Sequence, residues 1–419
     1  MLQRPGDGAL MESNRSAHTD TIQTDASDSF RAQLKPLLVL TSLFGVNFAA
    51  RIIYAPLMPE IEKDLNLSHG EAGSLFLLIS IGYFISLTGS GWVAARLTHR
   101  KTITLSSMVL GLALIGTAFS NSLWNIRLSL LVLGLAAGLY LPSGIATLME
   151  FISSRHWGKA IAVHELAPSL AFVVIPLLSE LVLVRFSWQT VVVLIGIAAL
   201  LMGVVFARFG SGGDFPGVAP SLGSFKPFFR ESAFWLMLFL FGLGISGTLG
   251  TYTMLPLYLV NDHGIERNFA NSLVAFSRIS GLGMAFVGGW LTDRIGAKRI
   301  LINVFLLSGI TTILMGLTSA PWVVVVLFVQ AMLAVCFFPA GFAALSRIGP
   351  SNARNISISL TVPFAFLFGG GAVPTAIGFM GDVASFSLGI TLLGVLILLG
   401  ALLSLFLKFQ GGADGSENF

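Results

Sequence analysis

Two stretches of the 419-residue chain, GWVAARLTHRK at 91–101 and GWLTDRIGAKR at 289–299, repeat one pattern after a shift of 198 residues. Both keep a Gly-Trp pair and two basic positions, because Gly91, Trp92, Arg96 and Lys101 align with Gly289, Trp290, Arg294 and Arg299. Each stretch directly follows a long apolar run. The repeat predicts two equivalent halves, related by an axis along the membrane normal if the apolar runs span a bilayer.

The composition around the repeat excludes most soluble classes of protein. Hydrophobic residues make up 55% of the chain and charged residues only 11%, against about 25% charged in soluble proteins. This excludes a water-soluble enzyme, and the apolar content excludes a disordered chain. The single cysteine, Cys336, forms no intramolecular disulfide or metal cluster. The net charge of +4 comes from scattered basic residues, so we expect no nucleic-acid surface.

Twelve apolar runs are long enough to cross a membrane, because about 30 Å of hydrocarbon requires roughly 20 helical residues. In the first half they lie near 36–58, 73–95, 102–120, 125–151, 160–183 and 187–207. In the second half they lie near 233–260, 270–292, 300–319, 322–345, 356–380 and 386–408. The runs lack the alternating polarity of transmembrane β-strands. We therefore predict an all-α fold with twelve transmembrane helices in two six-helix bundles.

The polar segments divide the chain. We assign 1–35 to a disordered cytoplasmic tail without a signal peptide, 36–208 to the N-terminal bundle, and 233–408 to the C-terminal bundle. The Gly-, Pro- and Ser-rich segment 209–232 is a cytoplasmic linker, and 409–419 is a second cytoplasmic tail.

Lysine and arginine set the orientation, because they accumulate in cytoplasmic loops. With the N-terminus inside, most of the 24 Lys and Arg residues fall in inner loops and tails. Only Lys63, Arg185 and Arg267 fall in outer loops. We expect a multi-pass protein of a bacterial inner membrane with both termini cytoplasmic.

The repeated loop resembles the signature of the major facilitator superfamily, Gly-x-Leu-x-Asp-Arg-x-Gly-x-Lys/Arg-Lys/Arg. The second copy follows that pattern closely, whereas the first has Ala95 in place of the Asp and Thr98 in place of the Gly. Span five has Ala167-Pro168 where antiporter members often have Gly-Pro, so that signature is not met. The resemblance implies a transporter that works by alternating access. It also implies conformational-switch roles for loop residues Gly91, Arg96, Arg100, Gly289, Asp293, Arg294, Gly296 and Arg299, with Asp293 helping to lock one access state.

Polar residues inside the spans suggest a substrate site. Placing a charged side chain at the bilayer centre costs about 2.5–3.5 kcal/mol on insertion scales, so such residues usually face a partner or a water-filled cavity. Asn47, Arg51 and Tyr54 share one face of span one, and Arg278 lies in span eight. Two arginines from opposite halves suit an anionic substrate, because guanidinium pairs with carboxylate or phosphate. The alternative is that each Arg pairs with a local carbonyl or carboxylate and braces its own bundle.

Other span residues extend this hypothesis. Tyr140, Tyr252 and Gln330 lie on spans that line the cavity in the resembled family, and each either contacts substrate or ties two helices together. His164 and Glu165 in span five are candidates for carrying a coupling proton, because histidine titrates near neutral pH and burial favours a protonated carboxyl. The alternative is a salt bridge or a simple hydrogen bond within the bundle.

The chain has no catalytic, metal-binding or nucleotide-binding pattern, so we expect no enzyme activity, cofactor or metal. We predict a monomeric secondary transporter in the lipid bilayer that moves a small organic anion, a mono- or dicarboxylate, with protons. Symport is preferred because the antiporter signature is not met. The rival transporter is an efflux antiporter for drugs or amphiphiles, with Glu165 as the binding carboxylate. The rival of another class is a non-transporting receptor or sensor on a transporter fold.

Overall fold

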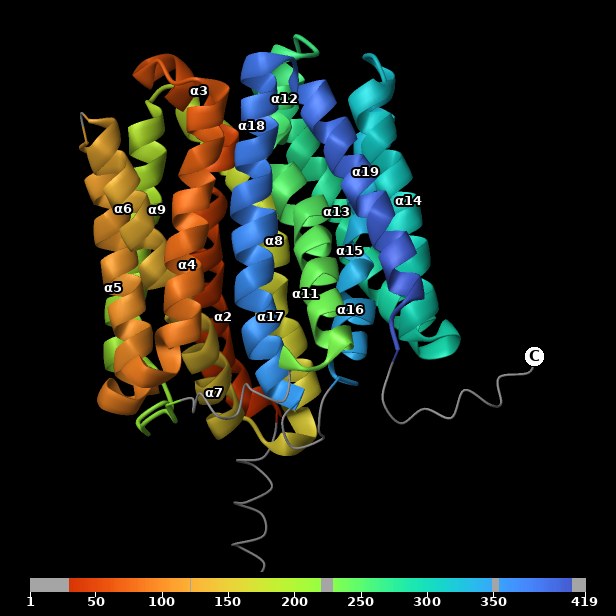
Figure 1. The fold of residues 1–419 in the computed structure, drawn as a ribbon. Helices are drawn as coiled ribbons and strands as arrows, with labels where there is room; N and C mark the ends of the chain where they lie inside the picture. The colour runs from red at the N-terminus through yellow and green to blue at the C-terminus, as the bar shows by residue number, and fades with distance from the viewer. Residues whose placement is uncertain (1–29, 121, 220–228, 349–353, 409–419) are drawn as a thin grey trace, which may run out of the picture.

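The computed structural model describes residues 30–120, 122–219, 229–348 and 354–408 (Figure 1). Within these ranges, twelve helical spans are long and apolar enough to cross a membrane, which confirms the predicted number and class. They are Gln33–Leu65, His69–Leu97, His99–Ala118, Leu123–Phe151, Ser154–Leu183, Trp188–Phe209, Ser232–Asn261, Arg267–Ile295, Ala297–Leu317, Trp322–Leu345, Ser357–Val383 and Phe386–Leu405. The tail predicted at 409–419 lies outside the described residues. The first helix begins at Phe30, inside the segment 1–35 assigned to the other tail.

Seven of the spans are single α-helices. They are α4 (His69–Leu97), α5 (His99–Ala118), α8 (Trp157–Leu183, preceded by the short helix η1 at Ser154–His156), α9 (Trp188–Phe209), α13 (Arg267–Ile295), α14 (Ala297–Leu317) and α19 (Phe386–Leu405).

The other five spans are interrupted. Span one divides into α2 (Phe30–Ile52) and α3 (Tyr54–Leu65), span four into α6 (Leu123–Gly138) and α7 (Tyr140–Phe151), and span ten into α15 (Trp322–Val335) and α16 (Phe337–Leu345). Span seven holds a π-helical turn, η3 (Ser246–Gly250), between α11 (Ser232–Ile245) and α12 (Thr251–Asn261). Span eleven holds another, η5 (Phe368–Ala372), between α17 (Arg354–Leu367) and α18 (Val373–Val383).

Prolines explain three of the interruptions. Pro56, Pro142 and Pro339 each stand four residues after the last residue of the preceding helix, which is Ile52, Gly138 and Val335 respectively. A proline has no N–H for the carbonyl four residues earlier, and its ring clashes with that carbonyl. The α-helical ladder therefore stops at that carbonyl and resumes one residue later.

The two halves form two bundles that lie side by side (Figure 1). Between them α4 packs on α17 and α18, α8 packs on α13, and α3 packs on α12. Glycines allow the close approach of α4 and α18: a Cβ on Gly73 would meet the Pro374 carbonyl oxygen at 2.6 Å. The helix α7, the start of α2 and the segment 210–217 lie at one end of the molecule (Figure 1). We call this end the linker face and the opposite end the far face.

The first part of the linker is bound to the N-terminal bundle. The Arg100 amide donates a hydrogen bond to the Gly213 carbonyl (2.7 Å), and the Gly213 amide donates one to Glu150 Oε2 (2.5 Å). Gly213 has a φ of +82°, which a side chain rarely tolerates. Arg100 also pairs with Asp214 at 3.0 Å. The linker thus brings a carboxylate to the repeated loop that has Ala95 in place of the usual Asp.

The two copies of the repeated loop share a backbone conformation with a positive φ at equivalent positions, +111° at Thr98 and +91° at Gly296. Each residue caps the helix before it, since the Thr98 amide bonds to the Ala94 carbonyl and the Gly296 amide to the Thr292 carbonyl. Glycine adopts this region freely, whereas threonine is strained there. The first copy therefore keeps the shape of the second loop at an energetic cost.

This difference predicts opposite effects of two matched substitutions. The Thr98 side chain also caps the start of α5 by accepting a hydrogen bond from the Lys101 amide. Thr98→Gly should stabilise the protein by about 1 kcal/mol, because releasing about 1–3 kcal/mol of strain outweighs the loss of this cap, which costs a few tenths of a kcal/mol. Gly296→Thr should destabilise it by a similar amount. Apparent unfolding temperatures of the detergent-purified variants check this. A lower unfolding temperature for Thr98→Gly would show that the loop is unstrained.

Candidate functional site

Arg51 lies at the end of α2, where span one is interrupted, and is only 8% exposed. Three aromatic rings surround its guanidinium carbon, with centroids at 4.2 Å (Tyr83), 4.9 Å (Phe48) and 5.3 Å (Phe366). The Nε–H group has no hydrogen-bond partner among the described residues. A guanidinium in contact with ring faces and with a free N–H edge is poised to bind an anion.

Arg278 is the counterpart in the other half, on α13, and is 9% exposed. Its guanidinium lies 5.1 Å from the Tyr252 ring and 5.3 Å from the Phe172 ring, and it donates one hydrogen bond of 3.4 Å to the Thr248 carbonyl in η3. Its Nε–H group also lacks a partner in the described part of the chain. Within the same residues neither arginine forms an ion pair. The alternative of a local partner fits the bond of Arg278 to the Thr248 carbonyl of its own half, whereas no carboxylate pairs with either arginine in these contacts.

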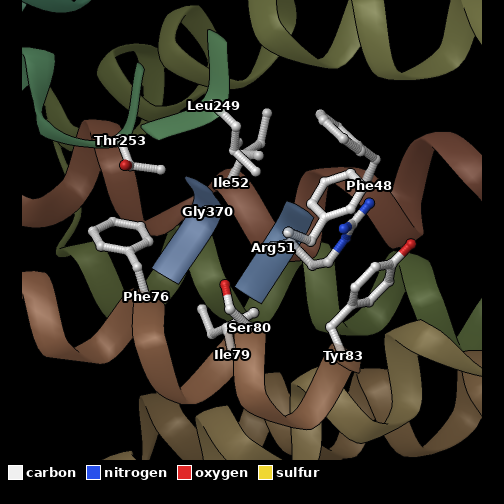
Figure 2. Close-up of a pocket in the computed structure, with 11 residues that line it drawn as sticks. Phe48, Arg51, Ile52, Phe76, Ile79, Ser80, Tyr83, Leu249, Thr253 and Gly370 are labelled. Carbon is white, nitrogen blue, oxygen red and sulfur yellow. The ribbon is translucent and has the colours of Figure 1, made fainter. Parts of the chain in front are cut away.

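A narrow cavity lies beside Arg51, between the two bundles (Figure 2). Span two contributes Phe76, Ile79, Ser80 and Tyr83 to the cavity wall, and span one contributes Phe48, Arg51 and Ile52. The second half contributes Leu249 from η3, Thr253 from α12, Phe366 from α17 and Gly370 from η5. Each contributing span reaches the cavity near its middle, and two of the contributing elements are π-helical turns. Such turns often occur at functional sites, and transporters commonly bind substrate at broken helices near the midplane.

Arg278 does not line this cavity. Phe172 separates it from Arg51, because the Phe172 ring packs edge-to-face on Phe48 at 5.0 Å and on Tyr252 at 4.6 Å. The two guanidinium groups are therefore linked by aromatic rings and do not face each other across open space.

The other residues predicted to bind substrate are buried, and three of them bond to backbone carbonyls of neighbouring helices. Asn47 Nδ2 donates to the Ala137 carbonyl (3.3 Å), the Tyr140 hydroxyl to the Leu40 carbonyl (2.7 Å), and Gln330 Nε2 to the Gly247 carbonyl (2.8 Å). These bonds fit the alternative in which each residue ties two helices together instead of contacting substrate. Tyr54 and Tyr252 are fully buried, and the Tyr252 hydroxyl has no partner among the described residues.

The cavity wall also contains four residues that were not predicted from the sequence: Ser80, Tyr83, Thr253 and Phe366. Ser80 and Tyr83 are three residues apart on one helix face, but such a pair is common in any apolar span. Only the packing of the two bundles brings them to the cavity.

His164 and Glu165 lie close together at the start of α8. His164 is fully buried, with Nε2 3.1 Å from the Tyr140 hydroxyl and Nδ1 3.4 Å from Glu165 Oε1, whereas the Glu165 side chain is 52% exposed. The single Tyr140 proton goes to the Leu40 carbonyl, so His164 Nε2 must donate to the Tyr140 oxygen. Nδ1 then faces the carboxylate, and a hydrogen bond between them requires one additional proton. The pair can therefore hold a proton between His164 and Glu165.

The far face is closed by polar contacts between the bundles. Arg267 on α13 forms ion pairs with Glu60 and Glu180 of the first half. Asp382, at the end of span eleven, accepts hydrogen bonds from the His69 and Gly70 amides at the start of α4, both at 2.8 Å. A carboxylate at a helix N-terminus also interacts favourably with the helix dipole.

The loop residues with predicted switch roles lie at the linker face. In the first copy Arg100 is bound to the linker, while Arg96 is exposed and Gly91 is half-buried. In the second copy Asp293, Arg294 and Arg299 are exposed, and Gly289 and Gly296 are half-buried. Their role in switching stays a prediction.

Comparisons with known proteins agree with this architecture. The model of the Major Facilitator Superfamily matches residues 40–302 and 253–416. The chain is 22% identical to the probable sulfoacetate transporter SauU of Cupriavidus necator (88% of this chain, 92% of SauU) and 23% identical to the gallate transporter of Pseudomonas putida (81% and 83%). A bacterial homolog of the human lysosomal transporter Spinster, solved in an inward-facing, unoccupied conformation, superposes with a TM-score of 0.78 (14% identity, 90% and 97% coverage).

The closure of the far face predicts that Arg267→Ala opens it. Removing the guanidinium leaves Glu60 and Glu180 without their partner, which should shift the opening equilibrium by about 1–2 kcal/mol. Spin labels at Lys63 and Ser319, in a Cys336→Ser background, should report a longer distance in the double electron–electron resonance distribution. Arg185→Ala, which removes an exposed charge from the same face, should leave the distribution unchanged. An unchanged distribution in Arg267→Ala would show that the ion pairs do not hold the face closed.

Proposed function

The chain belongs to the major facilitator superfamily of membrane transporters, and we propose that its substrate is a small organic anion, a mono- or dicarboxylate. One observation carries the proposal: each half buries an arginine, Arg51 or Arg278, that lacks a carboxylate partner within the described residues. An uncompensated buried charge is costly, so an anionic ligand at either site offsets that cost. The names of the sulfoacetate and gallate transporters support an organic acid.

The transport cycle in this proposal is alternating access about the midplane. The bundles rock around the cavity beside Arg51, and the closed far face corresponds to a state open toward the linker face. We place the linker face in the cytoplasm, on the inner side of a bacterial inner membrane, because its loops hold most of the basic residues. The protein acts as a monomer, in which each bundle supplies one arginine.

Proton coupling is the energy source in this proposal. The His164–Glu165 pair holds the proton, and Glu165 is within electrostatic reach of Tyr83, whose ring contacts Arg51. Asn47, Tyr54, Tyr140, Tyr252 and Gln330 shape the surroundings of the site. The rival reading, efflux of cationic amphiphiles, would need a carboxylate in the cavity, and the described lining residues include none.

Substitution of the arginines tests the substrate class. Arg51→Ala should lower carboxylate uptake into proteoliposomes by about 10- to 100-fold, because a hydrogen bond to a charged group contributes about 1.5–3 kcal/mol. Arg278→Ala should lower it as well, and Arg185→Ala should leave it unchanged. Full anion uptake by both Arg51→Ala and Arg278→Ala would refute the proposal, as would the absence of carboxylate transport in the unmodified protein.

Substitution of the proton pair tests the coupling separately. Glu165→Gln and His164→Ala should abolish accumulation driven by a pH gradient, since neither can hold the shared proton. Glu165→Gln should keep carboxylate exchange across the membrane without a gradient, because exchange needs no net proton movement. Gradient-driven accumulation that persists in both variants would place the coupling proton elsewhere.

A further inference from the structure

The surroundings of Arg51 narrow the substrate class, and this inference rests on the proposed function. We propose that the cavity binds a planar aromatic monocarboxylate, with the carboxylate on Arg51 and the aromatic ring between the cavity's own rings. The proposal has three independent supports: the charge of the cavity, the geometry of the free guanidinium edge, and the chemistry of the walls.

The cavity offers one positive charge. Among the lining side chains Arg51 is the single cation, and Arg278 lies outside the cavity behind Phe172. The wall on the second half presents Leu249, Thr253, Phe366 and Gly370, which carry no charge. A second carboxylate on the same ligand would lie against uncharged groups, without a cation to pair with. A site of this kind rejects dianions strongly, because a buried unpaired charge is costly.

The guanidinium edge selects a flat ligand. A carboxylate binds guanidinium through two parallel hydrogen bonds in the guanidinium plane, and the free Nε–H lies on one such edge. Phe48, Tyr83 and Phe366 surround the guanidinium, and Figure 2 shows its nitrogen atoms beside Tyr83. In a benzoate-like acid the carboxylate and the ring share one plane. Such a ligand places its ring in the plane of the guanidinium, so that the aromatic side chains around Arg51 can pack against it.

The walls of the cavity match such a ligand. Aromatic rings attract one another in offset or edge-to-face arrangements, each contributing about 0.5–1.5 kcal/mol beyond burial, or roughly 2- to 12-fold in affinity. Phe76 adds a further ring on the side of the cavity away from Tyr83 (Figure 2). The hydroxyl groups of Ser80 and Thr253 also line the space, so ring substituents that form hydrogen bonds are accommodated.

Binding to the purified full-length protein, with three acids as probes, tests the proposal. Benzoate should bind most tightly. Cyclohexanecarboxylate has the same charge and carbon count without a flat ring, and it should bind about 3- to 10-fold more weakly. Succinate, a dicarboxylate, should bind at least about 100-fold more weakly.

Variants connect these preferences to the cavity. Phe366→Leu should reduce the preference for benzoate over cyclohexanecarboxylate, and Phe379→Leu, an exposed position on the same span, should retain it. Arg51→Lys keeps the charge but removes the paired donors, and it should weaken benzoate binding about 10-fold or more.

The outcomes separate this inference from the proposed function. Succinate binding as tight as benzoate would overturn the aromatic monocarboxylate and leave organic-anion transport standing. Equal affinity for benzoate and cyclohexanecarboxylate, or a benzoate preference that Phe366→Leu retains in full, would also overturn it. If none of the three acids binds, and no other carboxylate is transported, the inference and the proposed function both fail.

Discussion

A buried guanidinium without a carboxylate is the constraint around which the middle of this protein is built. Insertion scales put the cost of an arginine at the bilayer centre at about 2.5–3.5 kcal/mol. Tyr83, Phe48 and Phe366 surround Arg51 and offset part of that cost, since a single cation–π contact contributes about 0.5–2 kcal/mol. A carboxylate in the same place would neutralise the site permanently. Aromatic rings stabilise the cation without neutralising it, and the Nε–H keeps no hydrogen-bond partner among the described residues.

Three of the five interruptions, those in spans one, seven and eleven, lie at the cavity beside this cation. α2 ends at Ile52, immediately after Arg51, and the π-helical turns η3 and η5 contribute Leu249 and Gly370 to the cavity wall. At each interruption the regular hydrogen-bond ladder is relaxed, so the two parts of a span can change their relative angle at low cost. The polar contacts of Arg267 and Asp382 join the two bundles at the far face only. The broken helices thus allow the far half to be closed independently of the linker half.

Much of the fold was predictable because its determinants are local. Apolar length sets each span, and the number of spans follows without knowledge of packing. The burial of Arg51 and Arg278 was predictable for the same reason. The cavity wall was not, because Ser80, Tyr83 and Phe366 look like ordinary span residues until two bundles meet. The hydrogen bonds from Asn47, Tyr140 and Gln330 to backbone carbonyls of other helices were not predictable either. No sequence pattern shows which side chain lies close to which neighbouring helix.

The contact between the linker and the N-terminal bundle was also not predictable from the sequence. Asp214 lies in a segment rich in glycine and proline, where no periodicity indicates a partner. Its pairing with Arg100 depends on Gly213, whose backbone conformation turns the linker onto the loop. A composition-based reading identifies this segment as a connection between halves, but its contact with the N-terminal bundle is a tertiary property.

Charge balance links the two parts of the proposed function. Tyr83 contacts Arg51 at 4.2 Å, and the charge of Glu165 acts electrostatically on Tyr83, so the proposed anion and proton sites are coupled through charge. When the cavity is empty and Glu165 is ionised, Arg51 and Glu165 together carry no net charge. When a carboxylate and a proton are both bound, the net charge is again zero. Binding either ligand alone adds one uncompensated charge within the membrane-spanning part of the protein, where charge is costly. In the proposed cycle the empty and doubly loaded carriers are therefore the forms that change access most readily. Linkage requires that each ligand then strengthens binding of the other, which is the condition for symport.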